Sequence, residues 1–169
     1  RRQRQMCIRD STATINFPIE KVHETLATKA YWEFEVERIG DEPGEVNSFS
    51  DNPAIEAVLF ETLPTAALPE AVRSMVSQAL KLKRTVVVNG LVDDSATGTI
   101  VAEVKGAPVK FESQVEMKKA NETTQLVVES AVDVNIPMMG SVLEPKVAEW
   151  IEDFITREAS LIEEYIKNN

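Results

Sequence analysis

Cysteine and histidine are almost absent from this chain, which contains one of each, Cys7 and His23, among 169 residues. A single cysteine cannot form an internal disulfide, so nothing indicates an oxidising compartment, and we expect an intracellular, cytoplasmic protein. A zinc site needs several cysteine or histidine ligands, and the chain lacks a second histidine. We therefore expect no metal, and a structural or surface role for His23.

Positive charge is scarce as well, because 18 lysine and arginine residues stand against 28 aspartate and glutamate residues, a net charge of −10. Nucleic acids and anionic membranes bind to basic surfaces, so we expect neither as the main partner. No apolar run approaches the length of a membrane span, and we expect no stable membrane insertion. The chain also lacks a glycine-rich phosphate loop, a Cys-x-x-Cys pair and a Gly-x-Ser-x-Gly motif, so we expect no cofactor.

The chain does contain a series of strand patterns between helical ones. A strand rich in threonine and isoleucine is predicted over 8–17, and a first helix begins after Pro18. A second short helix carries Trp32, Val36 and Ile39. Further strands are predicted over 45–49, 54–63, 82–92, 97–104, 108–117 and 124–136. The chain contains no repeat or linker, so residues 1–169 are predicted to form one domain, with 1–6 as a flexible tail.

The final helical pattern is the longest in the chain. From about residue 140 to Tyr165, apolar residues recur at about 100° per residue and form one stripe. Its members are Leu143, Val147, Trp150, Ile151, Phe154, Leu161, Ile162 and Tyr165. A helix of this length spans roughly 40 Å, so a small domain must wrap a large surface, such as a curved sheet, around it. A shorter pattern over 68–80 is either a lid or a cover for a sheet edge, and we favour the cover.

Alternation in the last two predicted strands indicates which face of the sheet is buried. Apolar side chains alternate with charged ones, so one face is apolar and the other charged. The inward set is Val109, Phe111, Ser113, Val115 and Met117, followed by Leu126, Val128, Val132 and Val134, with Ser130 as a polar exception. The final helix must cover this apolar face.

This order of elements resembles the START-like superfamily. The resemblance includes the junction Ile136-Pro137-Met138-Met139-Gly140-Ser141-Val142-Leu143-Glu144. Together with the opening Thr14-Ile15-Asn16-Phe17-Pro18-Ile19-Glu20-Lys21-Val22, it is more narrowly similar to a family of unknown function found mainly in actinobacteria. The resemblance covers essentially the whole chain and implies an α+β helix-grip fold. In that fold a seven-stranded antiparallel sheet curves around a long C-terminal helix, over an internal cavity.

The superfamily includes lipid-transfer START domains, polyketide cyclases and aromatases, and the birch-pollen-allergen proteins. The resemblance therefore implies a ligand held inside the fold. The chain departs from the simplest pattern where 68–80 replaces the tight connection between the third and fourth strands. This departure affects the expected opening and size of the cavity.

Glu158 interrupts the apolar stripe of the final helix near its middle. Two interpretations stay open, and we favour the one in which its long side chain reaches solvent at the edge of the fold. If Glu158 is buried instead, its carboxylate must find a donor, shift its pKa upward or face a polar cavity. It could then bind a ligand hydroxyl or act as a general acid or base, which makes it a weak catalytic candidate.

The leading functional hypothesis is a non-catalytic binder or carrier of a hydrophobic small molecule, such as a lipid or a polyketide-like compound. Two alternatives stay open: a cyclase- or aromatase-type enzyme that uses a cavity carboxylate, and a protein-interaction module with a filled core. The expected ligand-binding residues are Trp32, Met75, Phe111, Val115, Met117, Val128, Val132, Met138, Met139, Val147, Trp150, Phe154 and Glu158.

Overall fold

The computed structural model describes residues 7–63, 80–106, 108–135 and 140–169. Its first elements are β1 (Cys7–Ile15), α1 (Ile19–Leu26) and α2 (Lys29–Arg38). The other strands are β2 (Glu45–Ser50), β3 (Ile55–Leu63), β4 (Leu80–Val88), β5 (Ser95–Lys105), β6 (Val109–Ala120) and β7 (Thr123–Val134). The chain ends in α4 (Gly140–Asn168). The predicted tail over 1–6 lies outside the described residues, as does the predicted helix over 68–80 except for Leu80, which begins β4.

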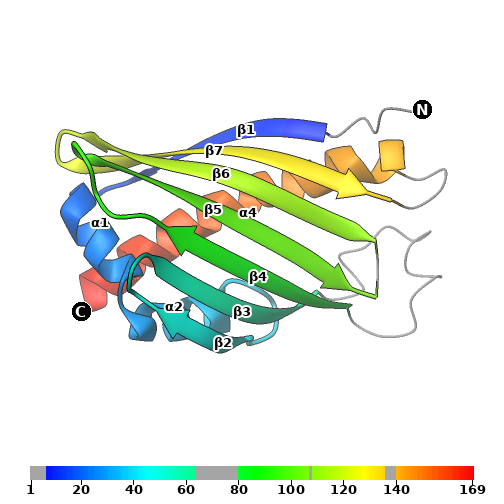
Figure 1. The fold of residues 1–169 in the computed structure, drawn as a ribbon, viewed down its shortest axis with the longest axis horizontal. Coiled ribbons are helices and arrows are strands. Elements are labelled where there is room, and N and C mark those ends of the chain that lie inside the picture. Colours follow the sequence, from blue (N-terminus) through cyan, green and yellow to red (C-terminus); the bar gives the residue numbers. More distant parts are fainter. Residues whose placement is uncertain (1–6, 64–79, 107, 136–139) are drawn as a thin grey trace.

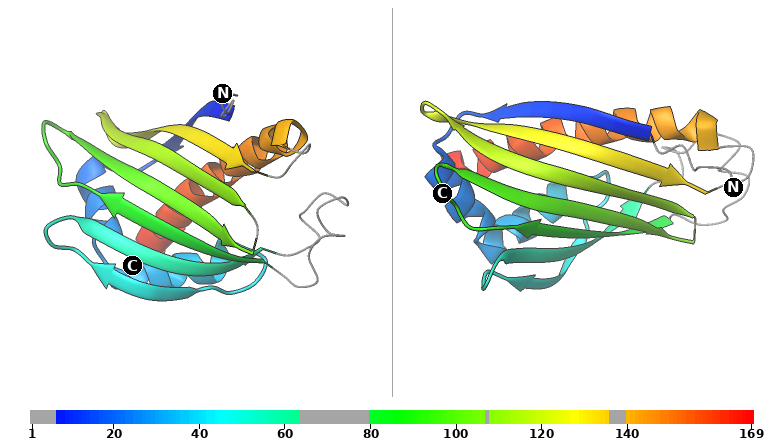
Figure 2. Two further views of the ribbon diagram at one scale, coloured as in Figure 1. Left: turned by 45° about the vertical axis from the view of Figure 1, so that its right-hand side comes forward. Right: turned by 45° about the horizontal axis from the view of Figure 1, so that its top comes forward.

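The strands form one antiparallel sheet of seven in the order β1-β7-β6-β5-β4-β3-β2. Consecutive strands lie side by side from β2 to β7, and β1 then pairs with β7 at the far edge. Figure 1 shows α4 running obliquely across one face of this sheet, and both views in Figure 2 show the sheet curving over it. The predicted seven-stranded sheet around a C-terminal helix is confirmed.

The strand boundaries lie within four residues of those predicted. The largest difference is the end of β4, at Val88 instead of residue 92. Between β4 and β5 the chain turns at Asp93 and Asp94, which adopt positive φ angles of 51° and 60°. Val92, just before the turn, forms only an isolated bridge with Ser95. Aspartate tolerates this left-handed conformation better than most residues, so the turn falls at these two positions.

The predicted inward faces of β6 and β7 are confirmed. Phe111, Ser113 and Met117 are buried on β6, while their neighbours in the strand are mostly exposed. Every second residue of β7 from Thr124 to Val134 is buried, as the alternation requires. These side chains form the core under α4.

The long helix begins and ends close to the predicted positions, and its 29 residues give a length of about 40 Å. Ala148 and Ala159 are buried on its inner face with Ile151, Ile155 and Ile162. Trp150 and Phe154, from the predicted stripe, are only partly buried and lie at its margin. Among the described residues, no helix is both long and apolar enough to cross a membrane.

A pair of serines interrupts the apolar inner face. Ser113 on β6 lies directly opposite Ser130 on β7, and their hydroxyl oxygens are 2.7 Å apart. Both side chains are buried, with exposed fractions of 2% and 0%. Each hydroxyl therefore satisfies the other, which explains why a polar residue is tolerated at the position of Ser130.

This pairing predicts a non-additive effect on stability. Ser130→Ala should lower the free energy of unfolding by about 1–2 kcal/mol, because it leaves the Ser113 hydroxyl without a partner. The double variant with Ser113→Ala should lose less than the sum of the two single losses, since it leaves no unpaired hydroxyl. Urea denaturation measures all three values, with Ser48→Ala on the exposed face of β2 as the control. Strictly additive losses would contradict the pairing.

Candidate functional site

One arginine is buried in the interior together with three glutamates. Arg84 has an exposed fraction of 1%, and its Nη2 donates to both carboxylate oxygens of Glu35 at 2.8 Å. Nη2 also donates to Glu61 Oε1 at 2.7 Å, and Nε donates to Glu61 Oε2 at 3.2 Å. Arg84 Nη1 lies 3.7 Å from Glu158 Oε1, too far for a hydrogen bond. We call these four residues the Arg84 cluster.

Ordinary periodicity places each member of the cluster inside. Arg84 occupies an inward position of β4, between Leu82 and Val86. Glu61 continues the inward set of β3, and the register pairs it with Leu82, so it lies diagonally across from Arg84. Glu35 lies one helical turn after Tyr31 on α2, on the face that packs inward. Four elements therefore contribute one charged side chain each, since Glu158 comes from α4.

The charges of the cluster do not balance, because one guanidinium faces three carboxylates. Burial raises the pKa of Glu35 to about 8, although the positive charge of Arg84 opposes the shift. Burial also raises the pKa of Glu158, again against the influence of Arg84, and the Glu61 carboxylate adds to the shift. The short contacts between Arg84 and Glu35 favour an ionised Glu35. A single guanidinium shared among three carboxylates does not offset the burial of all of them, so the raised pKa prevails.

Arg84 itself stays charged. Burial disfavours its cationic form, but Glu35, Glu61 and Glu158 together outweigh that cost and raise its pKa well above the usual range. The nearby Tyr31 is also fully buried, and burial, with a smaller contribution from the charges of Glu35 and Glu158, raises the pKa of its phenol well above 10. Tyr31 therefore remains a neutral hydroxyl beside the cluster.

The cluster has hydrogen-bonding capacity that the described residues do not use. Arg84 Nη1 and the Tyr31 hydroxyl are both buried and have no hydrogen-bond partner in that part of the chain. The Glu158 carboxylate makes no hydrogen bond there either, and its one polar contact is the 3.7 Å approach to Arg84. Buried polar groups are nearly always paired, so these three groups need a further partner.

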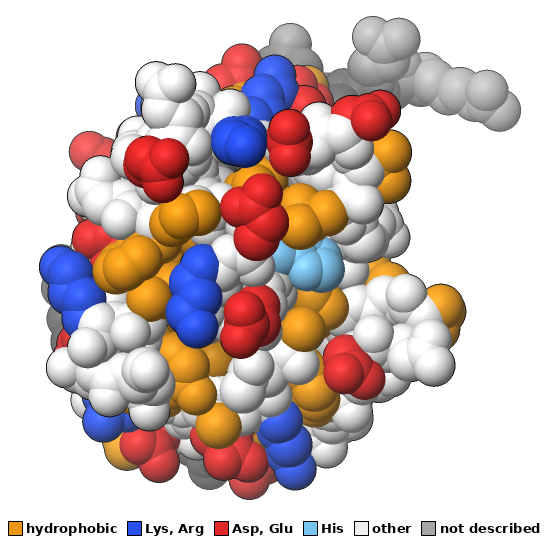
Figure 3. Space-filling model, turned by 90° about the vertical axis from the view of Figure 1, so that its left-hand side faces the viewer, with side chains coloured by type: hydrophobic (Ala, Val, Ile, Leu, Met, Phe, Trp, Pro, Cys, Tyr) orange, Lys and Arg blue, Asp and Glu red, His pale blue; other side chains and the backbone are white. Residues whose placement is uncertain are grey.

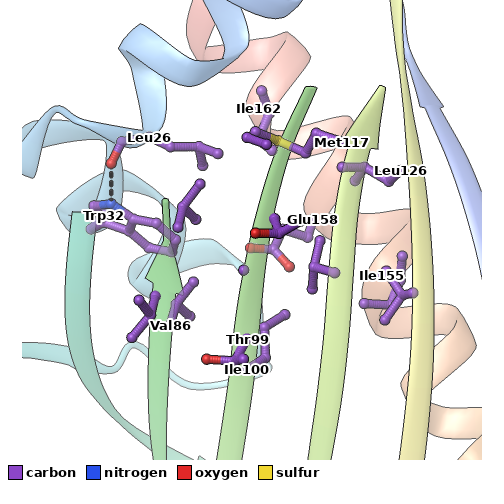
Figure 4. A pocket seen from close by; sticks show the side chains of 17 residues that line it. Leu26, Trp32, Val86, Thr99, Ile100, Met117, Leu126, Ile155, Glu158 and Ile162 are labelled. Atoms are coloured by element: carbon purple, nitrogen blue, oxygen red, sulfur yellow. Dashed lines mark hydrogen bonds between the residues drawn. The ribbon is translucent and has the colours of Figure 1, made fainter. Parts of the chain in front are cut away.

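Small cavities adjoin the cluster. A cavity of about 40 Å³ lies between the sheet and α4, walled by apolar side chains such as Val86, Ile100 and Leu126, with Glu158 at its border. Figure 4 shows the Glu158 side chain among these apolar ones, with Trp32 fixed nearby by its 2.8 Å hydrogen bond to the Leu26 carbonyl oxygen.

Two further spaces lie on the other side of the cluster. One of about 10 Å³ is bordered by Arg84, Ser113 and Phe154. A pocket of about 300 Å³ opens at the surface beside Glu61, and Trp150 and Phe154 line it as well as the smaller space. The Arg84 cluster therefore lies between the apolar cavity and the surface.

The structure places the predicted ligand-binding residues in several groups. Trp32, Val115, Met117, Val128 and Glu158 line the 40 Å³ cavity. Phe111, Trp150 and Phe154 border the 10 Å³ space, and Val132 is buried in the core without lining either. Val147 belongs to α4, but its side chain is not described. The other three predicted residues, Met75, Met138 and Met139, lie outside the described residues.

The favoured interpretation of Glu158, that its side chain reaches solvent, is wrong. Glu158 has an exposed fraction of 8%, and its carboxylate points toward Arg84. Glu158 lies on the face of α4 that also carries the buried Ile155, Ala159 and Ile162, so its side chain faces the interior. The alternative interpretation, a buried carboxylate with a raised pKa, is confirmed.

The sequence analysis missed Arg84, Glu35 and Glu61. Alternation could have found Arg84, because Leu82 and Val86 flank it at inward positions of the same strand. Among the described residues, no group of three or more histidine, cysteine, aspartate or glutamate side chains is placed to hold a metal ion. The cluster carboxylates surround a guanidinium instead.

The single histidine lies away from this site. His23 Nε2 is 3.0 Å from the carbonyl oxygen of Asn89, a contact that ties α1 to the segment after β4. Figure 3 views the end of the molecule that carries the histidine, where acidic and basic side chains are interspersed with hydrophobic ones. This contact is a structural one, of the kind expected for His23.

A curved antiparallel sheet around a C-terminal helix is the helix-grip fold, which this chain shares with a START superfamily protein. Similar solved structures include a conserved protein from Geobacillus kaustophilus (TM-score 0.60, 15% identity, 96% of each chain covered). Norcoclaurine synthase from Thalictrum flavum has a TM-score of 0.60 at 9% identity, covering 98% of this chain and 88% of the synthase. A START superfamily protein from Mycobacterium smegmatis has a TM-score of 0.54 at 10% identity, covering 95% and 97%.

At these identities the likeness to solved structures shows the fold alone. Residues 10–166 match the family model described as a protein of unknown function, DUF2505, and the chain belongs to this family. None of the curated proteins matches the chain. The predicted helix-grip fold is confirmed, whereas membership of the START-like superfamily and the actinobacterial distribution of the family stay predictions.

The Arg84 cluster predicts a large loss of stability when its cation is removed. Arg84→Met leaves three buried carboxylates without their positive partner and should lower the free energy of unfolding by roughly 3–5 kcal/mol near neutral pH. Lys110→Met is the control, because it breaks an exposed pair with Glu112 and should cost less than about 1 kcal/mol. Urea denaturation measures both values. Similar losses in the two variants would show that the cluster is not an interacting unit.

The raised pKa of Glu35 predicts a pH dependence of stability. In the folded protein the Glu35 carboxyl keeps its proton up to about pH 8, whereas a free glutamate loses its proton near pH 4.5. The contribution of Glu35 to the free energy of unfolding is therefore fully present below pH 4.5 and is lost as the pH rises through about 8. The stability of the wild type relative to Glu35→Gln should fall between about pH 5 and pH 9. Glu33→Gln, exposed on the same helix, should show no such trend.

Proposed function

We propose that this protein binds a small, mainly apolar molecule between the sheet and α4. The observation that carries the proposal is the 40 Å³ cavity, whose walls are almost entirely apolar and whose border holds the Glu158 carboxylate without a hydrogen bond from any described residue. Sites for small molecules combine apolar walls with a few polar groups that orient the ligand. A carboxylate that lacks a hydrogen bond is costly to bury, and a ligand that supplies one would offset this cost.

The size of the cavity restricts the ligand. A volume of about 40 Å³ admits only a few water molecules, whereas pockets for drug-sized ligands span roughly 300–1,000 Å³. A lipid or polyketide-like compound therefore requires the interior to widen. The surface pocket of about 300 Å³ shares Trp150 and Phe154 with the space beside Arg84, so rotation of these two side chains would join that space to the surface. A compact aromatic molecule needs the smallest rearrangement.

Two neighbours in fold support a compact ligand. Norcoclaurine synthase from Thalictrum flavum is similar to this chain in a structure with dopamine and hydroxybenzaldehyde, with a TM-score of 0.60. Dicamba monooxygenase, of which this chain covers half the length, is similar in a complex with 3,6-dichlorosalicylic acid, with a TM-score of 0.58. Both proteins hold small aromatic molecules, the class of ligand that requires the least widening of the interior here. A cytoplasmic location, expected from the single cysteine, belongs to the same proposal.

A second candidate function is an enzyme of the cyclase or aromatase type. The observation that favours it is the buried Glu158 carboxyl at the border of the cavity, whose pKa burial raises and which could therefore exchange a proton with a bound ligand. A single variant distinguishes an enzyme from a carrier. Glu158→Gln should abolish turnover in an enzyme while a ligand still binds, whereas a carrier has no turnover to lose.

Filling the cavity tests the main proposal. Val115→Phe places a larger side chain into the cavity and should weaken toluene binding by about tenfold or more, because it occupies the ligand's volume. Val127→Phe is the matched control, since Val127 lies on the neighbouring strand and points to the opposite face, and it should change binding by less than about threefold. Titration followed by ¹H–¹⁵N NMR gives both dissociation constants.

Equal weakening in both variants would place the binding site elsewhere. If the wild-type protein binds neither toluene nor any molecule that co-purifies with it, the filled-core interaction module becomes the better hypothesis. Organic extraction of the purified protein, followed by mass spectrometry, identifies a co-purifying molecule.

A further inference from the structure

We infer that the ligand carries a hydroxyl group, as an alcohol or a phenol, whose oxygen bridges Arg84 Nη1 and the Glu158 carboxylate. This inference rests on the proposed function and names the polar group of the ligand. It follows from the geometry of two unsatisfied groups that face each other across a gap.

The spacing of the two groups allows one oxygen atom, placed beside the line that joins them, to bond to both. Arg84 Nη1 and Glu158 Oε1 are 3.7 Å apart, which is too far for a direct hydrogen bond. An oxygen placed about 2.8 Å from each atom forms normal hydrogen bonds to both. Nη1 is buried and has no other hydrogen-bond partner among the described residues, so this contact would satisfy it.

The rest of the cluster holds the guanidinium ready for this contact. Glu35 and Glu61 occupy Nη2 and Nε, which leaves Nη1 as the free nitrogen on the side of Glu158. The Phe154 ring packs 4.8 Å from Arg84 Cζ and supports the guanidinium plane. A donor held in place by its other partners binds a ligand at a low cost in conformational freedom.

Charge and hydrogen-bond direction favour a hydroxyl over other groups. An anionic ligand would place its negative charge beside the acidic groups of Glu35, Glu61 and Glu158, which already outnumber the one guanidinium. An ammonium group would be attracted by these carboxylates but offers no acceptor to Arg84 Nη1. A hydroxyl carries no charge, accepts from Nη1 and donates to an ionised Glu158, and it still accepts from Glu158 when that residue is protonated. The unpaired hydroxyl of Tyr31, buried beside the same carboxylates, supplies a second neutral donor nearby.

The test compares phenol with toluene, which have nearly the same shape and differ in the hydroxyl group. Calorimetric titration gives the dissociation constant of each for the wild type, Glu158→Leu and Glu164→Leu. Glu164 is exposed on the same helix and serves as the matched control. The hydroxyl's bond to Glu158 should favour phenol, so Glu158→Leu should reduce the preference for phenol over toluene by about 10-fold or more, with toluene binding retained. Glu164→Leu should leave the preference unchanged.

Three outcomes would overturn the inference. The first is a preference for phenol that survives Glu158→Leu, the second is equal affinity for phenol and toluene in the wild type, and the third is tighter binding of benzylamine than of phenol. Each of these leaves the proposed apolar site standing, since a ligand binds. If neither toluene nor phenol binds, the proposed function itself fails.

Discussion

The interior of this protein depends on the burial of one guanidinium with three carboxylates. Arg84 belongs to β4, and its partners come from α2, β3 and α4, so one side chain joins four elements that are distant in the sequence. Moving such charges out of water costs several kcal/mol per ion, and only close mutual contact offsets this cost. We interpret the cluster less as a source of net stability than as a constraint on how α2 and α4 sit on the sheet.

This constraint also shapes the space inside the fold. The cluster separates an apolar cavity beside Trp32 from a smaller space beside Phe154 and from the surface pocket beyond it. Charged groups at this depth cannot move into the apolar cavity without losing their partners, so they mark a fixed boundary within the interior. The apolar walls, by contrast, include flexible side chains such as Met117, which can change rotamer at little cost. The 40 Å³ cavity itself can therefore widen by movement of its apolar walls while the cluster stays in place.

The order of the strands and the buried faces of β6 and β7 followed from periodicity, since these two strands alternate and α4 repeats at helical spacing. Glu158 was identified for the same reason, as a charge inside an apolar stripe. Arg84 escaped notice because it follows Lys81 and Lys83 in a strand with several basic residues, which suggests a solvated face. Its pairing with Glu35 depends on where α2 packs against the sheet, and local sequence patterns do not predict that packing. The size of the cavity could not be predicted either, because it depends on how side chains from four strands and three helices pack together.

The pairing of β1 with β7 has a consequence for how the chain is made. Cys7 lies opposite Val132, so β1 is synthesised before the rest of the sheet and finds its neighbour only when β7, the last of the described strands, has been made. Throughout that interval the backbone donors and acceptors of β1 have no strand beside them, and the core under α4 cannot close. Newly made chains therefore pass through a long period with an open strand, which is when they are most exposed to association with one another.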